Sequence, residues 1–111
     1  MEIEKSLLSG STPMLILALL EGKDMYGYEM TAELSRRSDD TFHLKEGTLY
    51  PLLHTLEKNR LISSYTTETP QGRQRKYYRL TEEGRRYLGE KKAQWQIFSE
   101  KVDMVLGRAM G

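Results

Sequence analysis

The chain contains no cysteine among its 111 residues. This absence excludes a disulfide framework, a thiolate zinc site and a cysteine nucleophile, and it fits the reducing cytoplasm, where we expect the protein to act. Long apolar runs are also lacking, because the longest, residues 14–20, has 7 residues where a membrane span needs about 20. The first residues lack the basic start and the small-residue cleavage site of a signal peptide. We therefore expect no membrane association and no export.

Catalytic constellations are missing as well. The two histidines, His43 and His54, are not accompanied by a carboxylate cluster that would suggest a metal site or a catalytic triad. No glycine-rich loop of the kind that cradles phosphates is present. We therefore expect no enzyme activity, no metal site and no cofactor.

The net charge is small, but the charged residues are unevenly distributed. The formal net charge is only +1, which on its own argues against a general polyanion binder. Residues 60–79, however, carry five basic side chains and one acid, Glu68, so this segment has a charge of +4 and the remainder of the chain −3. Positive charge is therefore concentrated in one segment.

Apolar periodicity and cap residues predict helices in the first half of the chain. We expect short helical turns over residues 3–10 and then a core helix that starts with Thr12 as N-cap and Pro13 at its first position and ends near Gly22. A second helix is predicted over residues 26–37, with Tyr26, Met30 and Leu34 as its buried stripe.

The third predicted helix begins near residues 46–48, because Pro51 lacks a backbone N–H and is tolerated in or beside the first turn. Its apolar side chains recur at helical spacing and commit one face to the core; they are Leu49, Leu52, Leu53 and Leu56.

Residues 62–68 and 74–80 alternate in period two around residues 69–72, which predicts a β-hairpin. From Thr81, the expected N-cap, a final helix is predicted to reach about Leu106, a length of about 39 Å. Such a helix is longer than the body of so small a domain can cover.

Three helices followed by a basic hairpin is the order of elements in a winged helix-turn-helix. We therefore predict a mainly α fold with a small β-hairpin, in which residues 1–80 form a DNA-binding domain and residues 81–111 a long C-terminal dimerisation helix. The outer face of the third helix and the hairpin tip would contact double-stranded DNA. The predicted DNA-binding residues are Lys45, Thr48, Tyr50, Pro51, His54, Lys58, Arg73, Arg75 and Lys76.

Two plainer interpretations remain open at this point. The polar side of the third helix is also what an ordinary solvated helix face looks like. The hairpin cations are also what protects an exposed edge strand against aggregation. Edge protection does not explain why acids are missing from residues 69–80 and present elsewhere, so the two features together favour DNA.

Three ordered motifs resemble the PadR-like transcriptional regulators, and the resemblance covers nearly the whole chain. They are Met25-Tyr26-Gly27-Tyr28-Glu29-Met30, Gly47-Thr48-Leu49-Tyr50-Pro51-Leu52-Leu53-His54, and the segment from Gly72 to Thr81. The resemblance implies a dimeric winged-helix repressor in which the helix holding Tyr50 reads DNA, the Gly72 hairpin is the wing and the last helix joins two subunits.

The chain departs from the family pattern between the third helix and the hairpin. Asn59-Arg60 stand where the family usually has Glu-Gly. Since asparagine tolerates left-handed backbone better than arginine, we expect Asn59 to take over the helix cap. Gln74 stands where proline is common, which predicts a more flexible wing.

The final helix carries a seam with coiled-coil spacing, interrupted by Lys91. We predict that this seam forms the interface of a homodimer, although it could also fold back on its own domain; its members are Leu88, Trp95, Phe98, Val102 and Val105. Near a two-fold axis, two copies of Trp95 could stack on a flat aromatic or cationic effector. The plainer interpretation, which we favour from the sequence, is that Trp95 only packs the interface.

These patterns predict a sequence-specific, ligand-responsive DNA-binding regulator that acts as a homodimer. That it represses transcription is implied by the resemblance alone. The alternative is a winged-helix adaptor that binds protein instead of DNA, which the near-neutral total charge would suit. Salt-dependent binding to duplex DNA separates the two functions.

Overall fold

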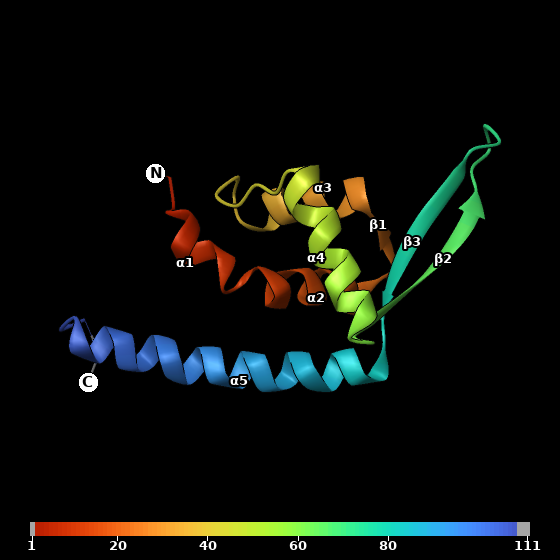
Figure 1. Ribbon diagram of the computed structural model, residues 1–111. Helices are drawn as coiled ribbons and strands as arrows, with labels where there is room; N and C mark the ends of the chain where they lie inside the picture. Colours follow the sequence, from red (N-terminus) through yellow and green to blue (C-terminus); the bar gives the residue numbers. More distant parts are fainter. Residues whose placement is uncertain (1, 109–111) are drawn as a thin grey trace.

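The structure is a computed structural model that describes residues 2–108. In these residues, five helices and a three-stranded antiparallel sheet make up the fold (Figure 1). The mainly helical architecture with a small sheet and a long last helix confirms the predicted fold class. In chain order the elements are α1 (Lys5–Ser9), α2 (Thr12–Gly22), β1 (Met25–Tyr26), α3 (Gly27–Arg37), α4 (Glu46–Lys58), β2 (Ile62–Glu68), β3 (Gln74–Leu80) and α5 (Glu82–Val105).

Helix α2 runs through the centre of the core, as its nearly continuous apolar surface predicted. Four of its side chains are at most 2 % exposed: Ile16, Leu17, Leu19 and Leu20. The predicted N-cap was wrong by one residue, because Ser11 precedes the helix and Thr12 lies inside it. The Thr12 hydroxyl instead donates to the Leu8 carbonyl at 3.0 Å, which links α2 to the preceding turn α1.

The start of α3 differs from the prediction. Met30 and Leu34 are buried as expected, but Tyr26 precedes the helix and pairs with Tyr77 as part of the short strand β1. The Tyr26 N–H donates to the Glu29 carboxylate at 3.2 Å, which satisfies a backbone donor at the helix start. Tyr26 therefore pairs with β3 in the sheet and does not form the first position of the helix, although periodicity suggested that it would.

Helix α4 begins at Glu46, within the predicted range, and buries Leu49, Leu53 and Leu56 against the core. Pro51 lies inside the helix, just beyond its first turn, as the predicted start requires. The missing N–H leaves a free carbonyl on the preceding turn, which water can satisfy because Pro51 and Gly47 are both exposed.

The end of α4 corrects the prediction for Asn59. Asn59 has φ −84° and Arg60 takes the left-handed conformation with φ 63°. The Leu61 N–H donates to the Leu56 carbonyl and the Arg60 N–H to the Glu57 carbonyl, both at 3.0 Å. This is a Schellman motif, in which the left-handed residue follows the C-cap, so the hydrogen-bond pattern overrides the preference of the side chain.

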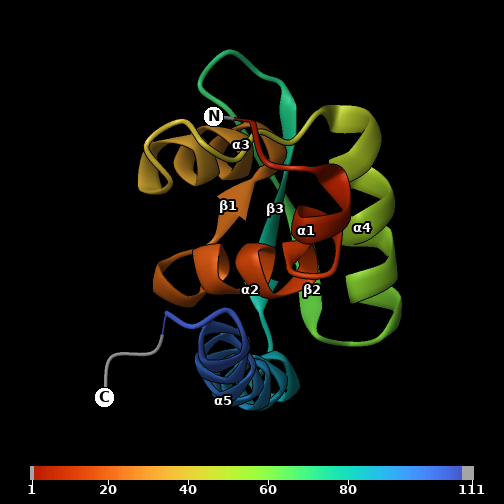
Figure 2. The same cartoon turned by 90° about the vertical axis from the view of Figure 1, so that its left-hand side faces the viewer.

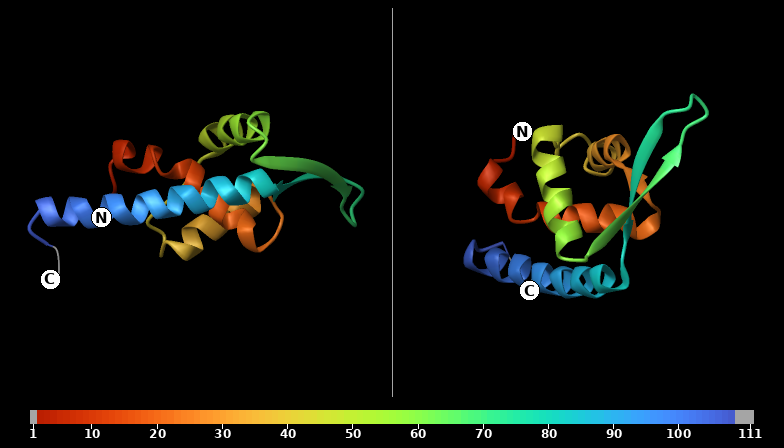
Figure 3. Two further views of the ribbon diagram at one scale, coloured as in Figure 1. Left: turned by 90° about the horizontal axis from the view of Figure 1, so that it is seen from below. Right: turned by 45° about the vertical axis from the view of Figure 1, so that its right-hand side comes forward.

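Both predicted hairpin strands have the expected bounds. Strand β3 lies between β1 and β2, with Met25 opposite Tyr78 and Ile62 opposite Leu80. One sheet face therefore joins the core, while the distal half of the β2–β3 hairpin extends beyond the helices (Figure 3).

Helix α5 is anchored at its beginning and projects at its end. The Thr81 hydroxyl accepts from the Gly84 N–H at 2.9 Å, which confirms the predicted cap, and Gly84 and Leu88 are buried. Beyond this point α5 runs beside α2 and extends past the body (Figures 1 and 2), so the molecule measures 56 × 31 × 21 Å. Within residues 2–108, no helix combines the length and apolar character that crossing a bilayer requires.

Candidate nucleic-acid interface

The outer face of α4 presents the predicted polar side chains to solvent. Its leucines hold the opposite face in the core, so the helix cannot rotate without exposing them. Exposed residues on this side include the N-cap and one face of the helix: Lys45, Thr48, Tyr50, Pro51, His54 and Lys58. Hydroxyl, imidazole and ammonium groups on one exposed helix face are the donors and acceptors that contact phosphates and base edges.

Tyr50 connects this helix face to the wing. Its side chain is 46 % exposed and lines a small hollow of about 210 Å³ together with Arg75 and Lys76 of β3. Tyr26 and Gly27, which lie where β1 passes into α3, also line the hollow. The first turns of α4 and the basic strand of the wing therefore meet at one surface.

A tight turn supports the tip of the wing. The Thr69 N–H donates to the Arg73 carbonyl at 2.7 Å, and the Gly72 N–H donates to the Thr69 carbonyl at 2.9 Å. Gly72 has φ +80°, a conformation in which side chains other than that of glycine are strained. Arg73 follows directly and is exposed, so the turn presents its guanidinium at the end of the hairpin.

The other two predicted wing cations already have partners within the protein. The Arg75 guanidinium lies over the Tyr26 ring, 4.1 Å from its centroid, and Arg75 is half-buried. The Lys76 ammonium lies 3.9 Å from the Glu57 carboxylate of α4. Arg75 and Lys76 therefore fix the base of the wing as well as contributing positive charge.

Glu57 is a positioning residue that the sequence analysis missed. Its carboxylate accepts a hydrogen bond of 2.5 Å from the Ser64 hydroxyl of β2, in addition to pairing with Lys76 of β3. Helix α4 is thus tied to both strands of the wing. An acid on the third helix was a weak signal, because its partners are distant in sequence.

A row of tyrosines stiffens the outer face of the sheet. Tyr77 of β3 contacts Tyr26 edge-on at 5.5 Å and stacks on Tyr65 at 5.8 Å between ring centroids. The Tyr65 hydroxyl donates to the Asp24 carboxylate at 2.7 Å, and this hydrogen bond raises the pKa of Tyr65. The wing is therefore braced on its outer face by aromatic contacts and one long-range hydrogen bond.

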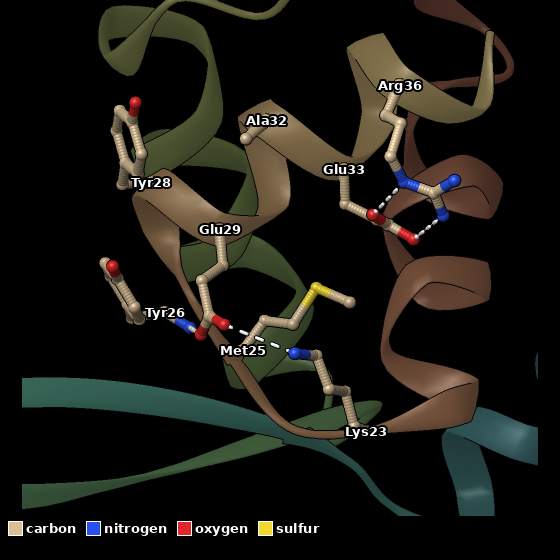
Figure 4. Close-up of a pocket in the computed structure, with 8 residues that line it drawn as sticks. All are labelled: Lys23, Met25, Tyr26, Tyr28, Glu29, Ala32, Glu33 and Arg36. Carbon is tan, nitrogen blue, oxygen red and sulfur yellow. Dashed lines mark hydrogen bonds and ion pairs between the residues drawn. The ribbon is translucent and has the colours of Figure 1, made fainter.

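A second hollow, of about 270 Å³, lies on α3 and is less suited to a polyanion (Figure 4). Lys23 pairs with Glu29 at 3.4 Å and Arg36 with Glu33 at 2.7 Å, so these charges largely cancel. Hydrogen bonds from Arg36 and Arg37 lower the pKa of Glu33 to about 2. Within residues 2–108, no group of three or more His, Cys, Asp or Glu side chains could hold a metal ion.

The predicted seam of α5 divides into a buried start and an exposed remainder. Leu88 is 1 % exposed in the protomer's own core, so the prediction that it lies at an interface is wrong. The remaining members are between 37 % and 87 % exposed: Trp95, Phe98, Val102 and Val105. Trp95 and Phe98 face α1, the start of α2 and Phe42 across a largely apolar cleft of about 750 Å³.

The helix-turn-helix formed by α3 and α4, with the β2–β3 hairpin beside it, defines a winged-helix DNA-binding protein. Residues 16–90 match the family model described as the transcriptional regulator PadR-like family. The chain therefore belongs to the PadR-like family of transcriptional regulators.

The chain is also similar to individual proteins. An uncharacterized protein X of Lysinibacillus sphaericus is 36% identical over 104 residues, which cover 94% of this chain and 95% of the relative. The transcriptional regulator Rv3488 of Mycobacterium tuberculosis is 35% identical over 71% of this chain and 70% of its own. The solved structure of a transcriptional regulator from Clostridium thermocellum superposes with a TM-score of 0.84 at 34% identity, covering 90% of this chain and 97% of that one.

Proposed function

We propose that the protein is a sequence-specific DNA-binding regulator that reads duplex DNA with the outer face of α4 and grips the backbone with its wing. The hollow shared by Tyr50, Arg75 and Lys76 carries this proposal. It joins a helix whose exposed polar groups can hydrogen-bond to base edges to a strand that carries positive charge. A helix fits the major groove of about 12 Å, and a hairpin beside it reaches the adjacent phosphates. Acting on DNA, the protein would work in the cytoplasm.

The cations divide into two groups with different expected roles. Within residues 2–108, neither Lys58 nor Arg73 forms an ion pair, so both are available to neutralise phosphates. Arg75 and Lys76 would mainly hold the wing in place. Tyr50 and His54, four residues apart on α4, are the expected readers of base edges.

Salt-dependent binding tests the electrostatic part of this proposal. The Arg73→Gln substitution should weaken binding to duplexes of every sequence and reduce the slope of log affinity against log salt by about 0.9. Arg85→Gln is the matched control, since Arg85 is exposed on α5. Wild-type affinity that does not change between low and moderate salt would overturn the proposal.

We also propose that the protein is a homodimer and represses transcription in response to a ligand. The exposed part of the α5 seam and the apolar cleft beside it support a second copy as the partner. A flat aromatic or cationic effector near Trp95 would change the spacing of the two wings and hence the fit to half-sites ~34–36 Å apart. Quenching of Trp95 emission, together with release of bound DNA, tests the effector.

A protein-binding adaptor is the competing function. Exposed apolar side chains on α5 would suit it, whereas the exposed cation at the wing tip would have no purpose in it. Selection of preferred sequences from random duplexes by the wild-type protein would decide against the adaptor.

A further inference from the structure

Gly27 lies directly under the phenol of Tyr50. A Cβ atom built on Gly27 would lie 2.5 Å from the Tyr50 hydroxyl oxygen, 3.0 Å from Cζ and 3.4 Å from Cε1. A separation of 2.5 Å between a Cβ atom and another heavy atom is essentially never seen in proteins. The Tyr50 ring therefore occupies the space that any side chain at position 27 would need.

The backbone does not itself require glycine at this position. Gly27 is the first residue of α3, and it is absent from the positions with positive φ, which include Gly72 and Gly107. Glycine is less favourable than alanine in a helix, because it loses more conformational freedom on folding. The feature that requires glycine here is the close approach of Tyr50.

The contact fixes where the Tyr50 hydroxyl lies relative to the wing. Gly27 is buried and lines the hollow that Tyr50 shares with Arg75 and Lys76. Next to it, Tyr26 carries the Arg75 guanidinium on its ring. One short segment, Tyr26-Gly27, thus supports a reader on α4 and a cation on β3.

We propose that Gly27 is a specificity-determining positioning residue that seats Tyr50 for base recognition without contacting DNA itself. The proposal rests on the DNA-binding function proposed above. A methyl group at position 27 would displace the Tyr50 hydroxyl. The flexible Tyr50 side chain would rotate to make room, and no backbone atom would have to move. The fold would therefore survive while the geometry of recognition would change.

The test uses a duplex that the wild-type protein selects from a random library and a pool of random duplexes of the same length. Gly27→Ala should lower affinity for the selected duplex by about tenfold, within the range for one lost base contact. Affinity for the random pool and its salt dependence should stay within about twofold, because the phosphate contacts are retained. A fresh selection with the variant should return a changed preference at the base read by Tyr50.

A double-mutant cycle tests whether Gly27→Ala acts by displacing the Tyr50 hydroxyl or by a general effect on the structure. The Tyr50→Phe substitution removes the atom that a new methyl would meet at 2.5 Å and leaves Cζ at 3.0 Å. Gly27→Ala should therefore cost less than about threefold in the Tyr50→Phe background, against about tenfold in the wild type. Gly22→Ala, at a helical glycine with nothing within 4 Å, is the matched control and should leave binding unchanged.

The outcomes distinguish this inference from the function on which it rests. A wild-type protein that selects no sequence overturns both. If the wild type selects a sequence and Gly27→Ala binds it equally well, the seating role alone is wrong. The same follows if Gly27→Ala costs the same factor with and without the Tyr50 hydroxyl.

Discussion

Arg60 shows how a single residue can hold an unfavourable conformation because its neighbours require it. The left-handed backbone costs a residue with a side chain about 1–2 kcal/mol relative to the right-handed form. Arg60 adopts it with φ 63° because the Schellman hydrogen bonds of Leu61 and Arg60 satisfy the last carbonyls of α4. The cap is therefore stable as a whole although one residue within it is strained.

Replacing Arg60 should consequently stabilise the protein. We expect Arg60→Gly to raise the free energy of unfolding by about 0.5–1 kcal/mol, since glycine relieves the strain and gives back part of the gain as unfolded-state entropy. Arg60→Ala is the control, because it removes the same charge and retains the strain. Urea denaturation of the three proteins measures the difference; equal gains in both variants would assign the effect to charge.

Glu33 gives the fold a pH dependence of known sign. Its pKa is lowered from 4.5 to about 2 by hydrogen bonds from Arg36 and Arg37. Because the folded-state pKa is lowered, the ionised Glu33 carboxylate contributes fully to the stability of the fold above pH 4.5, and this contribution is lost as the pH falls toward 2. We expect the stability difference between the wild type and Glu33→Gln to shrink over that interval in denaturation series, whereas a constant difference would show that ionisation plays no part.

At this scale, the residues predictable from sequence are those whose roles depend on local pattern. The exposed positions on α4 followed from helical periodicity, as did the burial of Leu49 and Leu53. Glu57 was missed and Tyr26 was assigned to the wrong element, because their partners on the wing come from later strands. Cross-strand neighbours are set by register, which a single sequence specifies only indirectly.

At the scale of elements, the junction between the wing and α5 is held by several short contacts. The Thr81 hydroxyl donates to the carbonyls of Arg60 and Leu61 at 2.7 Å and 3.0 Å, and the Thr81 N–H donates to the Leu61 carbonyl at 3.1 Å. Gly84 lies so close to Leu61 that a Cβ there would overlap its carbonyl oxygen. The start of α5 is thus fixed to the end of α4.

Substitution of Gly84 should therefore be costly. The obstructing atom is backbone, which cannot turn away as the Tyr50 side chain can, so we expect Gly84→Ala to lower the free energy of unfolding by about 3 kcal/mol. Gly89→Ala in the same helix, where nothing lies within 4 Å, should be neutral or slightly stabilising. Thermal unfolding followed by circular dichroism compares the two; similar melting temperatures would contradict the packing argument.

Element boundaries were predictable where a cap or a proline marks them. Thr81 and the hairpin limits matched, because their signals are local. The strand β1 was not predicted, because it has two residues and exists only through pairing with β3. The C-terminal helix also begins inside the winged-helix body, since Leu88 belongs to the core, so its first turns support the DNA-binding domain.

At the scale of the whole molecule, α5 extends from the winged-helix body to the exposed apolar face. Its first turns are joined to α4 through Thr81 and Leu61, and an ion pair of 2.9 Å between Lys92 and Glu21 holds its middle against α2. Its second half carries the exposed apolar face.

The last prediction concerns what covers this face. If a second copy does, Phe98→Glu should raise the dimer dissociation constant about 30-fold or more, because a charge would be buried at a central apolar contact. Gln96→Glu places the same charge on the other side of the helix, near Glu100, and should leave the dimer intact. Sedimentation equilibrium measures both. Because a dimer would span two half-sites, the Phe98→Glu variant should also lose cooperative binding to a two-half-site duplex while keeping weak binding to one. A wild-type protein that sediments as a monomer would contradict a second copy as the cover of this face.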